Sequence, residues 1–254
     1  MGRSIDLNCD MGEGFGSDEE ILPHVTSVNI ACGYHAGDPA IMRKTVRLAI
    51  DHGVAIGAHP GLPDLAGFGR RVMQVTPQEV YDLVLDQALA LAAIARAAGV
   101  AVTHLKPHGA LYNMAAKDAA IAQAIAAATH NFDPACILVA LAGSELIKAG
   151  ENAGLTTASE AFADRTYQVD GSLTPRHSAD ALIHDSATAA ERVLKMVLHG
   201  TVTSQQGTEL ALHVDTICIH GDSLGAADFA KAIRERLRRE GIVVKSLARS
   251  YHAH

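Results

Sequence analysis

Carboxylate, imidazole and cationic side chains gather after six short apolar runs of this sequence. If each run is a β-strand, these side chains follow the carboxyl ends of the strands. In α/β barrels and open α/β sheets those ends meet on one face, which carries the active site. The sequence therefore indicates an enzyme, with reactive groups among Asp10, Glu13, His35, Asp38, His59, Lys106, His108, Glu160, Arg165, His220 and Asp222.

The first of these groups combines a polar strand face with a glycine-rich turn. Residues 6–10 alternate between polar and apolar, which places Asn8 and Asp10 on the same face of a strand. The glycines in 12–16 let the backbone approach a ligand closely and aim N–H groups at an anion. The turn matches neither a Walker A loop nor a dinucleotide fingerprint. We expect Asn8, Gly12 and Gly14 to bind substrate or phosphate, and capping of the turn by a carboxylate is the structural alternative.

Four of the fourteen histidines occupy equivalent positions, each after an expected strand and beside Gly or Pro. They are His35, His59, His108 and His220. Together with Asp10 or Asp222 they could bind a divalent metal, or they could serve as acids and bases. The sequence contains neither HxH nor HExxH spacing, so both roles stay open beside that of ordinary loop histidines.

Cations collect near the same strand ends. Lys106 and His108 flank a rigid Pro turn, while Arg70, Arg71 and Arg165 supply guanidinium forks that suit carboxylate or phosphate. The chain as a whole carries a net charge of −7. An acidic protein that gathers cations on one rim is predicted to bind an anionic small molecule, with surface salt bridges as the alternative.

Composition excludes several other classes of function. A net charge of −7 argues against nucleic-acid or anionic-membrane partners, which need a basic surface. The four cysteines form no CxxC pair and are expected to be buried free thiols. The first expected strand begins within a few residues of Met1, and no apolar stretch reaches membrane-spanning length. We expect a cytoplasmic protein.

Strand and helix patterns alternate along the chain. Asp38-Pro39 and Thr76-Pro77 are typical helix starts. This βα order predicts an α/β fold, a single-domain (β/α) barrel over residues 1–254 with seven or eight mostly parallel strands. Long polar loops are expected at 59–75 and 161–181. Strands are expected near 5–10, 28–31, 54–58, 102–105, 137–141, 155–159, 214–219 and 242–246, and helices near 38–52, 76–99, 118–129, 144–153, 185–198 and 226–240.

Seven motifs spread over nearly the whole chain resemble the LamB/YcsF family, which supplies the A subunit of bacterial 5-oxoprolinases. The resemblance implies a barrel related to the polysaccharide deacetylase type. It also implies ATP-dependent opening of 5-oxo-L-proline to L-glutamate, with two further subunits, B and C. The matching segments are 6–13, 29–39, 57–60, 67–71, 106–113, 160–165 and 220–222.

The implied reaction assigns roles to the candidate residues. An unstrained lactam is a poor electrophile, so coupling to ATP with Mg²⁺ would form an imidate-like intermediate that water attacks. The glycine turn would hold phosphate, Asp10 or Glu13 would be the base, and His108 would protonate the departing nitrogen. The catalytic set is then Asp10, Glu13, Lys106, His108 and Asp222. The set binding substrate or phosphate is Asn8, Gly12, Gly14, His35, Asp38, His59, Arg70, Arg71, Glu160, Arg165 and His220.

Two other functions remain open. A metal-dependent deacetylase or amidohydrolase would hold a divalent metal on Asp10, His35 and His59, act alone and need no ATP. A non-catalytic subunit would bind 5-oxoproline or a partner while another chain performed the reaction.

Overall fold

The computed structural model describes residues 2–221 and 225–247. Within these residues, seven parallel strands pair in order and the last returns to the first, closing a barrel. A further short strand, β10 (Val243–Val244), pairs in parallel with the start of β1. The expected barrel of seven or eight mostly parallel strands is confirmed. Its strands are β1 (Ser4–Met11), β2 (Ser27–Ala31), β3 (Ala55–His59), β4 (His104–Leu105), β5 (Ile137–Leu141), β6 (Thr157–Phe162) and β9 (Thr216–Ile219).

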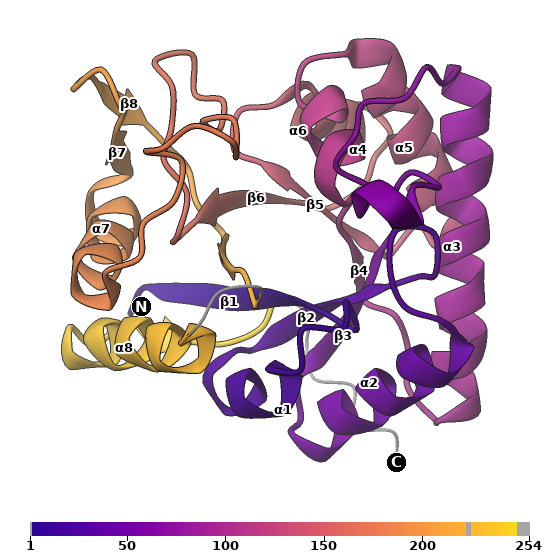
Figure 1. The fold of residues 1–254 in the computed structure, drawn as a ribbon, viewed down its shortest axis with the longest axis horizontal. Coiled ribbons are helices and arrows are strands. Elements are labelled where there is room, and N and C mark those ends of the chain that lie inside the picture. The colour runs from indigo at the N-terminus through magenta and orange to yellow at the C-terminus, as the bar shows by residue number, and fades with distance from the viewer. Residues whose placement is uncertain (1, 222–224, 248–254) are drawn as a thin grey trace.

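Helices surround the ring of strands (Figure 1). Local sequence signals start them: the Asp38 side chain accepts hydrogen bonds from two N–H groups of α2, and Thr76 forms a capping box with Glu79 on α3. Among the described residues, none of the helices is both long and apolar enough to cross a membrane. The helices are α1 (Asp18–Ile21), α2 (Pro39–Asp51), α3 (Pro77–Ala97), α4 (Gly109–Ala115), α5 (Ala119–Phe132), α6 (Glu145–Asn152), α7 (Ser186–His199) and α8 (Ala226–Arg239), with 3-10 turns at Leu22–His24 and Leu65–Gly67.

The interior of the barrel is polar, whereas the strand faces toward the helices are apolar. On β1 the buried Leu7 and Cys9 join the hydrophobic core, while Asp6 and Asn8 alternate with them and bond to other strands. The Asp6 carboxylate accepts hydrogen bonds from three hydroxyl groups, and burial raises its pKa. Buried polar groups are stable only when paired, so this network fixes the floor beneath the carboxyl ends of the strands.

The structure also contains elements that the periodicity does not predict. An antiparallel pair of three-residue strands, β7 (Thr201–Thr203) and β8 (Glu209–Ala211), lies between α7 and β9. The seven-residue helix α4 follows directly on the Pro107 turn. Segments this short show too few repeats for an apolar period to be recognised. The polar stretch 161–181 remains a loop after β6, as expected, held by isolated bridges.

Candidate active site

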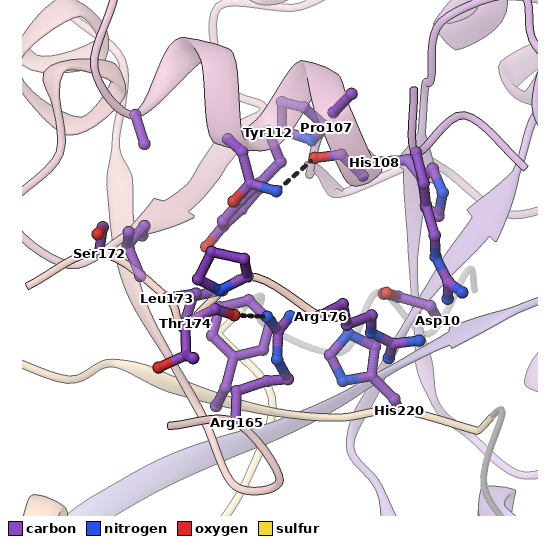
Figure 2. Close-up of a pocket in the computed structure, with 18 of the residues that line it drawn as sticks. Asp10, Pro107, His108, Tyr112, Arg165, Ser172, Leu173, Thr174, Arg176 and His220 are labelled. Carbon is purple, nitrogen blue, oxygen red and sulfur yellow. Dashed lines mark hydrogen bonds between the residues drawn. The ribbon is translucent and has the colours of Figure 1, made fainter. Parts of the chain in front are cut away.

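A cavity of about 680 Å³ lies at the carboxyl ends of the strands. Among the described residues, its lining includes two carboxylates, Asp10 and Glu13, against a larger number of cations. Figure 2 shows Arg165, Arg176, Asp10 and His220 extending into the same space. The cavity is therefore more cationic than the acidic chain that contains it. The lining cations are Arg70, Lys106, Lys117, Arg165 and Arg176.

Lys106, which follows β4, lies at the centre of the cavity floor. Its buried Nζ is 2.9 Å from Asp10 Oδ1 and 2.9 Å from Glu160 Oε1, and it donates to Cys218 Sγ at 3.2 Å. Burial opposes its charge, but Asp10 raises the pKa of Lys106 well above 10.5. Burial would also raise the pKa of Asp10, yet His59 and Lys106 hold it well below 3.8. The floor is a charged pair, not two neutral groups.

His59, at the end of β3, has its protons located by its neighbours. Its Nδ1 lies 2.7 Å from the Lys106 carbonyl oxygen, which only accepts, so Nδ1 carries a proton. Its Nε2 lies 3.3 Å from Asp10 Oδ2 and 3.0 Å from His108 Nδ1. Burial would lower the pKa of His59, but the Asp10 charge outweighs it and raises the pKa. His59 therefore links the Asp10–Lys106 pair to the next group of side chains.

That group consists of Glu13, His35 and His108. Glu13 Oε1 lies 3.3 Å from both His35 Nε2 and His108 Nδ1, and the two imidazole rings stack with centroids 3.7 Å apart. His108 Nε2 is 2.9 Å from the Phe68 carbonyl oxygen and donates to it. Burial lowers the pKa of His35 to about 4 and also lowers that of His108, so both rings are neutral. Hydrogen bonds from the histidines outweigh burial and lower the pKa of Glu13 to about 2.

The opposite wall carries a second imidazole–carboxylate pair. His220, after β9, places Nδ1 2.7 Å from Asp164 Oδ2 and stacks on Phe162. Burial would raise the pKa of Asp164, but the neighbouring His220 lowers it. The carboxylate accepts the Nδ1 proton, which leaves Nε2 on the other edge of the ring. His220 lines the cavity, so this pair is suited to acid–base chemistry there.

The long loop after β6 brings guanidinium groups over the cavity. Arg165 is buried and donates from Nη2 to the Thr174 carbonyl at 2.6 Å, as drawn in Figure 2. Among the described residues, its buried Nε has no hydrogen-bond acceptor. Arg176 lines the same cavity. A guanidinium held at one end with an unused N–H at the other is suited to an anionic ligand.

A model of the LamB/YcsF family matches residues 5–252 of this sequence. The chain belongs to the LamB/YcsF family. The 5-oxoprolinase A subunit of Geobacillus kaustophilus is 60% identical over 248 residues, covering 96% of this chain and 97% of that protein. The crystal structure of the lactam utilization protein from Thermus thermophilus has a TM-score of 0.89 at 46% identity, covering 96% and 100% of the two chains.

The fold extends beyond close relatives of this LamB/YcsF chain. The peptidoglycan deacetylase PdaC from Bacillus subtilis superimposes with a TM-score of 0.52 at 13% identity, covering 97% of this chain and 88% of PdaC. At that identity the likeness concerns the fold alone. It confirms the expected relation to barrels of the polysaccharide deacetylase type.

Many of the sequence-predicted site residues come together. They form one connected group of ion pairs, hydrogen bonds and cavity wall. Asn8 lies below the cavity, where its Nδ2 donates to Glu160 Oε1 at 2.9 Å. Arg70 and Arg165 reach the rim. The residues brought together are Asn8, Asp10, Glu13, His35, His59, Arg70, Lys106, His108, Glu160, Arg165 and His220.

Other predicted residues take structural positions instead. Asp38 caps α2 and is exposed, and Arg71 forms a bidentate ion pair with Asp64. The Gly12 N–H donates to Asp18 Oδ2 at 3.0 Å, so a carboxylate occupies the donor that was expected to hold phosphate. Gly14 is exposed in the same turn and does not line the described cavity. Asp222 lies outside the described residues.

Several residues at the site were missed by reasoning from the sequence. Asn29 Nδ2 donates to both Asn8 and Asp10, and Tyr112 OH donates to Glu160 Oε2 at 2.7 Å. Cys218, expected as a structural thiol, is an acceptor for Lys106. Asp164 offered a usable signal because it directly precedes Arg165 in a polar cluster after a strand. The residues missed are Asn29, Tyr112, Asp164, Arg176 and Cys218.

Two groups of described residues have donor atoms close enough to share a metal ion. One is Glu13 with His35, His59 and His108, and the other is Asp10 with Cys218 and His220. The metal set expected from sequence, Asp10 with His35 and His59, is divided between them. Asp10 belongs with the Lys106 ammonium, and Glu13 takes its place beside the histidines.

Proposed function

We propose that this chain is the A subunit of a 5-oxoprolinase that opens 5-oxo-L-proline to L-glutamate, coupled to hydrolysis of ATP. The observation that carries the proposal is the cationic cavity of an acidic protein, with a charged pair on its floor and an imidazole on its wall. Relatives at up to 60% identity have the name of that subunit. The substrate is a small lactam that bears one carboxylate.

The substrate carboxylate has its counterpart in the loop after β6. Arg165 offers an unused, buried N–H, and Arg176 adds a second positive charge on the same wall. Such charge-assisted hydrogen bonds are stronger than neutral ones and orient a planar carboxylate. With the carboxylate held there, the lactam ring lies toward Lys106 and His220.

The His220–Asp164 pair is the proposed acid and base. Asp164 holds His220 Nδ1–H, so Nε2 can take a proton from attacking water and return it to the departing nitrogen. This replaces His108, which the sequence suggested as the acid. Both nitrogens of His108 are engaged, one with the Phe68 carbonyl and the other with His59 and Glu13.

Coupling to ATP answers the low reactivity of an unstrained lactam. Phosphorylation of the amide oxygen gives an electrophile that water can attack, and Mg²⁺ normally accompanies ATP in such transfers. In this chain Asp18 occupies the Gly12 N–H, and Lys106 and Asn29 occupy Asp10 Oδ1. Those groups do not fit phosphate or Mg²⁺, so we assign neither to them. Two further subunits, B and C, complete the proposed enzyme in the cytoplasm.

A reconstituted complex tests the proposal. The purified chain with subunits B and C, ATP and Mg²⁺ should release glutamate and ADP together, whereas the chain alone should release neither. His220→Gln and Asp164→Asn should lower kcat by roughly 10²-fold, and Arg165→Met should raise KM for 5-oxoproline. Lys117→Met, on the exposed rim, is the matched control. Unchanged kinetics in all three site variants would instead indicate a non-catalytic subunit.

The Glu13–histidine group favours one alternative, a metal-dependent amide hydrolase acting alone. Its signature is glutamate release by the isolated chain with a divalent metal and without ATP. That result would refute the coupled reaction and establish the alternative.

A further inference from the structure

Four side chains from four consecutive strand ends point their donor atoms at a common centre. Glu13 follows β1, His35 follows β2, His59 ends β3 and His108 follows β4. All three histidines are buried, and the Glu13 side chain is 8% exposed. We propose that Glu13, His35, His59 and His108 bind one Zn²⁺ ion that joins these four loops.

The separations between the donor atoms match a tetrahedral zinc site. A Zn–N or Zn–O distance of about 2.0–2.1 Å places neighbouring ligand atoms about 3.3–3.5 Å apart. Here His59 Nε2 lies 3.0 Å from His108 Nδ1 and 3.8 Å from Glu13 Oε1. Glu13 Oε1 lies 3.3 Å from His35 Nε2 and 3.3 Å from His108 Nδ1. All four donors lie within 4.8 Å of one another.

Hydrogen bonds outside the group fix the histidine tautomers that a metal requires. Ligating histidines usually donate their second N–H to a carboxylate or a backbone carbonyl. His59 donates from Nδ1 to the Lys106 carbonyl, and His108 donates from Nε2 to the Phe68 carbonyl. Each ring therefore turns its other nitrogen toward the centre. A backbone carbonyl behind each of two rings is the arrangement that orients metal ligands.

The donor set selects the kind of cation. Three imidazole nitrogens and one carboxylate suit Zn²⁺, whereas Mg²⁺ prefers oxygen donors and retains water. The carboxylate offsets part of the cation charge in a buried place. Four protein donors complete a tetrahedral shell, which is typical of structural zinc sites. The site can therefore stabilise the barrel mouth whichever reaction the cavity performs, and zinc binding there does not depend on the proposed function.

Cation binding by the isolated chain tests this site directly. The full chain is stripped with a chelator and titrated with Zn²⁺ by calorimetry, and with Co²⁺ as a spectroscopic probe. We expect one equivalent to bind, with visible bands typical of tetrahedral Co²⁺. Zn²⁺ at about 100 times its Kd should raise Tm by roughly 5–10 °C. Mg²⁺ should neither compete nor raise Tm.

Variants locate the ion. Glu13→Gln, His35→Gln and His108→Gln should each weaken Zn²⁺ binding by roughly 100-fold or more, whereas the surface control His52→Gln should bind normally. His108→Cys should keep binding and add a sulfur-to-cobalt charge-transfer band, which tests the site even if a glutamine variant fails to fold. No bound Co²⁺, an octahedral spectrum, or loss of binding only in His220→Gln, which belongs to the other group, would overturn the proposal.

Discussion

Replacing Lys106 with methionine removes a buried ammonium but keeps a side chain of similar length. The Lys106 side chain is 3% exposed, and its partners Asp10 and Glu160 are 7% and 0% exposed. Without the ammonium, these carboxylates are left buried with only neutral partners and His59. Breaking a buried ion pair on one side costs about 3–5 kcal/mol. With m near 3 kcal/mol/M, the urea midpoint should fall by roughly 1–2 M at pH 7.

The pH dependence gives the prediction its sign. In the wild-type protein the pKa of Asp10 is held well below 3.8, so its contribution to stability is fully present above that value and is lost as pH falls through the lowered pKa. The deficit of Lys106→Met should therefore be complete at pH 7 and shrink below about pH 4. Adding Asp10→Asn should restore part of the stability, because it removes one uncompensated charge.

The matched control is Lys117→Met. Lys117 is 64% exposed and lies 3.4 Å from the exposed Asp170, a pair expected to contribute at most about 1 kcal/mol. The measurement is urea denaturation followed by circular dichroism for both variants. A loss below about 1 kcal/mol in Lys106→Met at pH 7 would refute the buried ion pair as a source of stability.

Individual contacts support three further predictions. Burial lowers the pKa of His104 to about 3, so the unfolded chain binds more protons below about pH 6.5 and stability should fall with pH; His104→Gln should flatten that slope by about 1.4 kcal/mol per pH unit in urea denaturation at pH 4–6.5. Asp10→Asn should lower turnover of the reconstituted complex by roughly 10²-fold, and near-normal turnover would remove Asp10 from the catalytic residues. Arg71→Met should leave KM for 5-oxoproline unchanged, because Arg71 pairs with Asp64 away from the cavity; a raised KM would return it to the binding site.

Signals carried by near neighbours in the chain were sufficient for much of the architecture. Asp38-Pro39 and Thr76-Pro77 mark helix starts because capping joins a side chain to N–H groups only two or three residues away. The βα alternation predicts parallel strands, and parallel strands bring polar groups after successive strands to one face. The barrel and the convergence of Asp10, Lys106 and His108 could therefore be anticipated.

Which of those groups bond to one another was decided by closure of the barrel. Asn8 meets Glu160, and Lys106 lies between Asp10 and Cys218, across separations of about a hundred residues that carry no signal in the sequence. Burial then set the protonation states, because a pKa depends on the dielectric and charges that surround a group in the folded protein. The sequence by itself determined which reactive groups reach the mouth of the barrel, and only the tertiary structure decided which of them are paired, charged or available to a ligand.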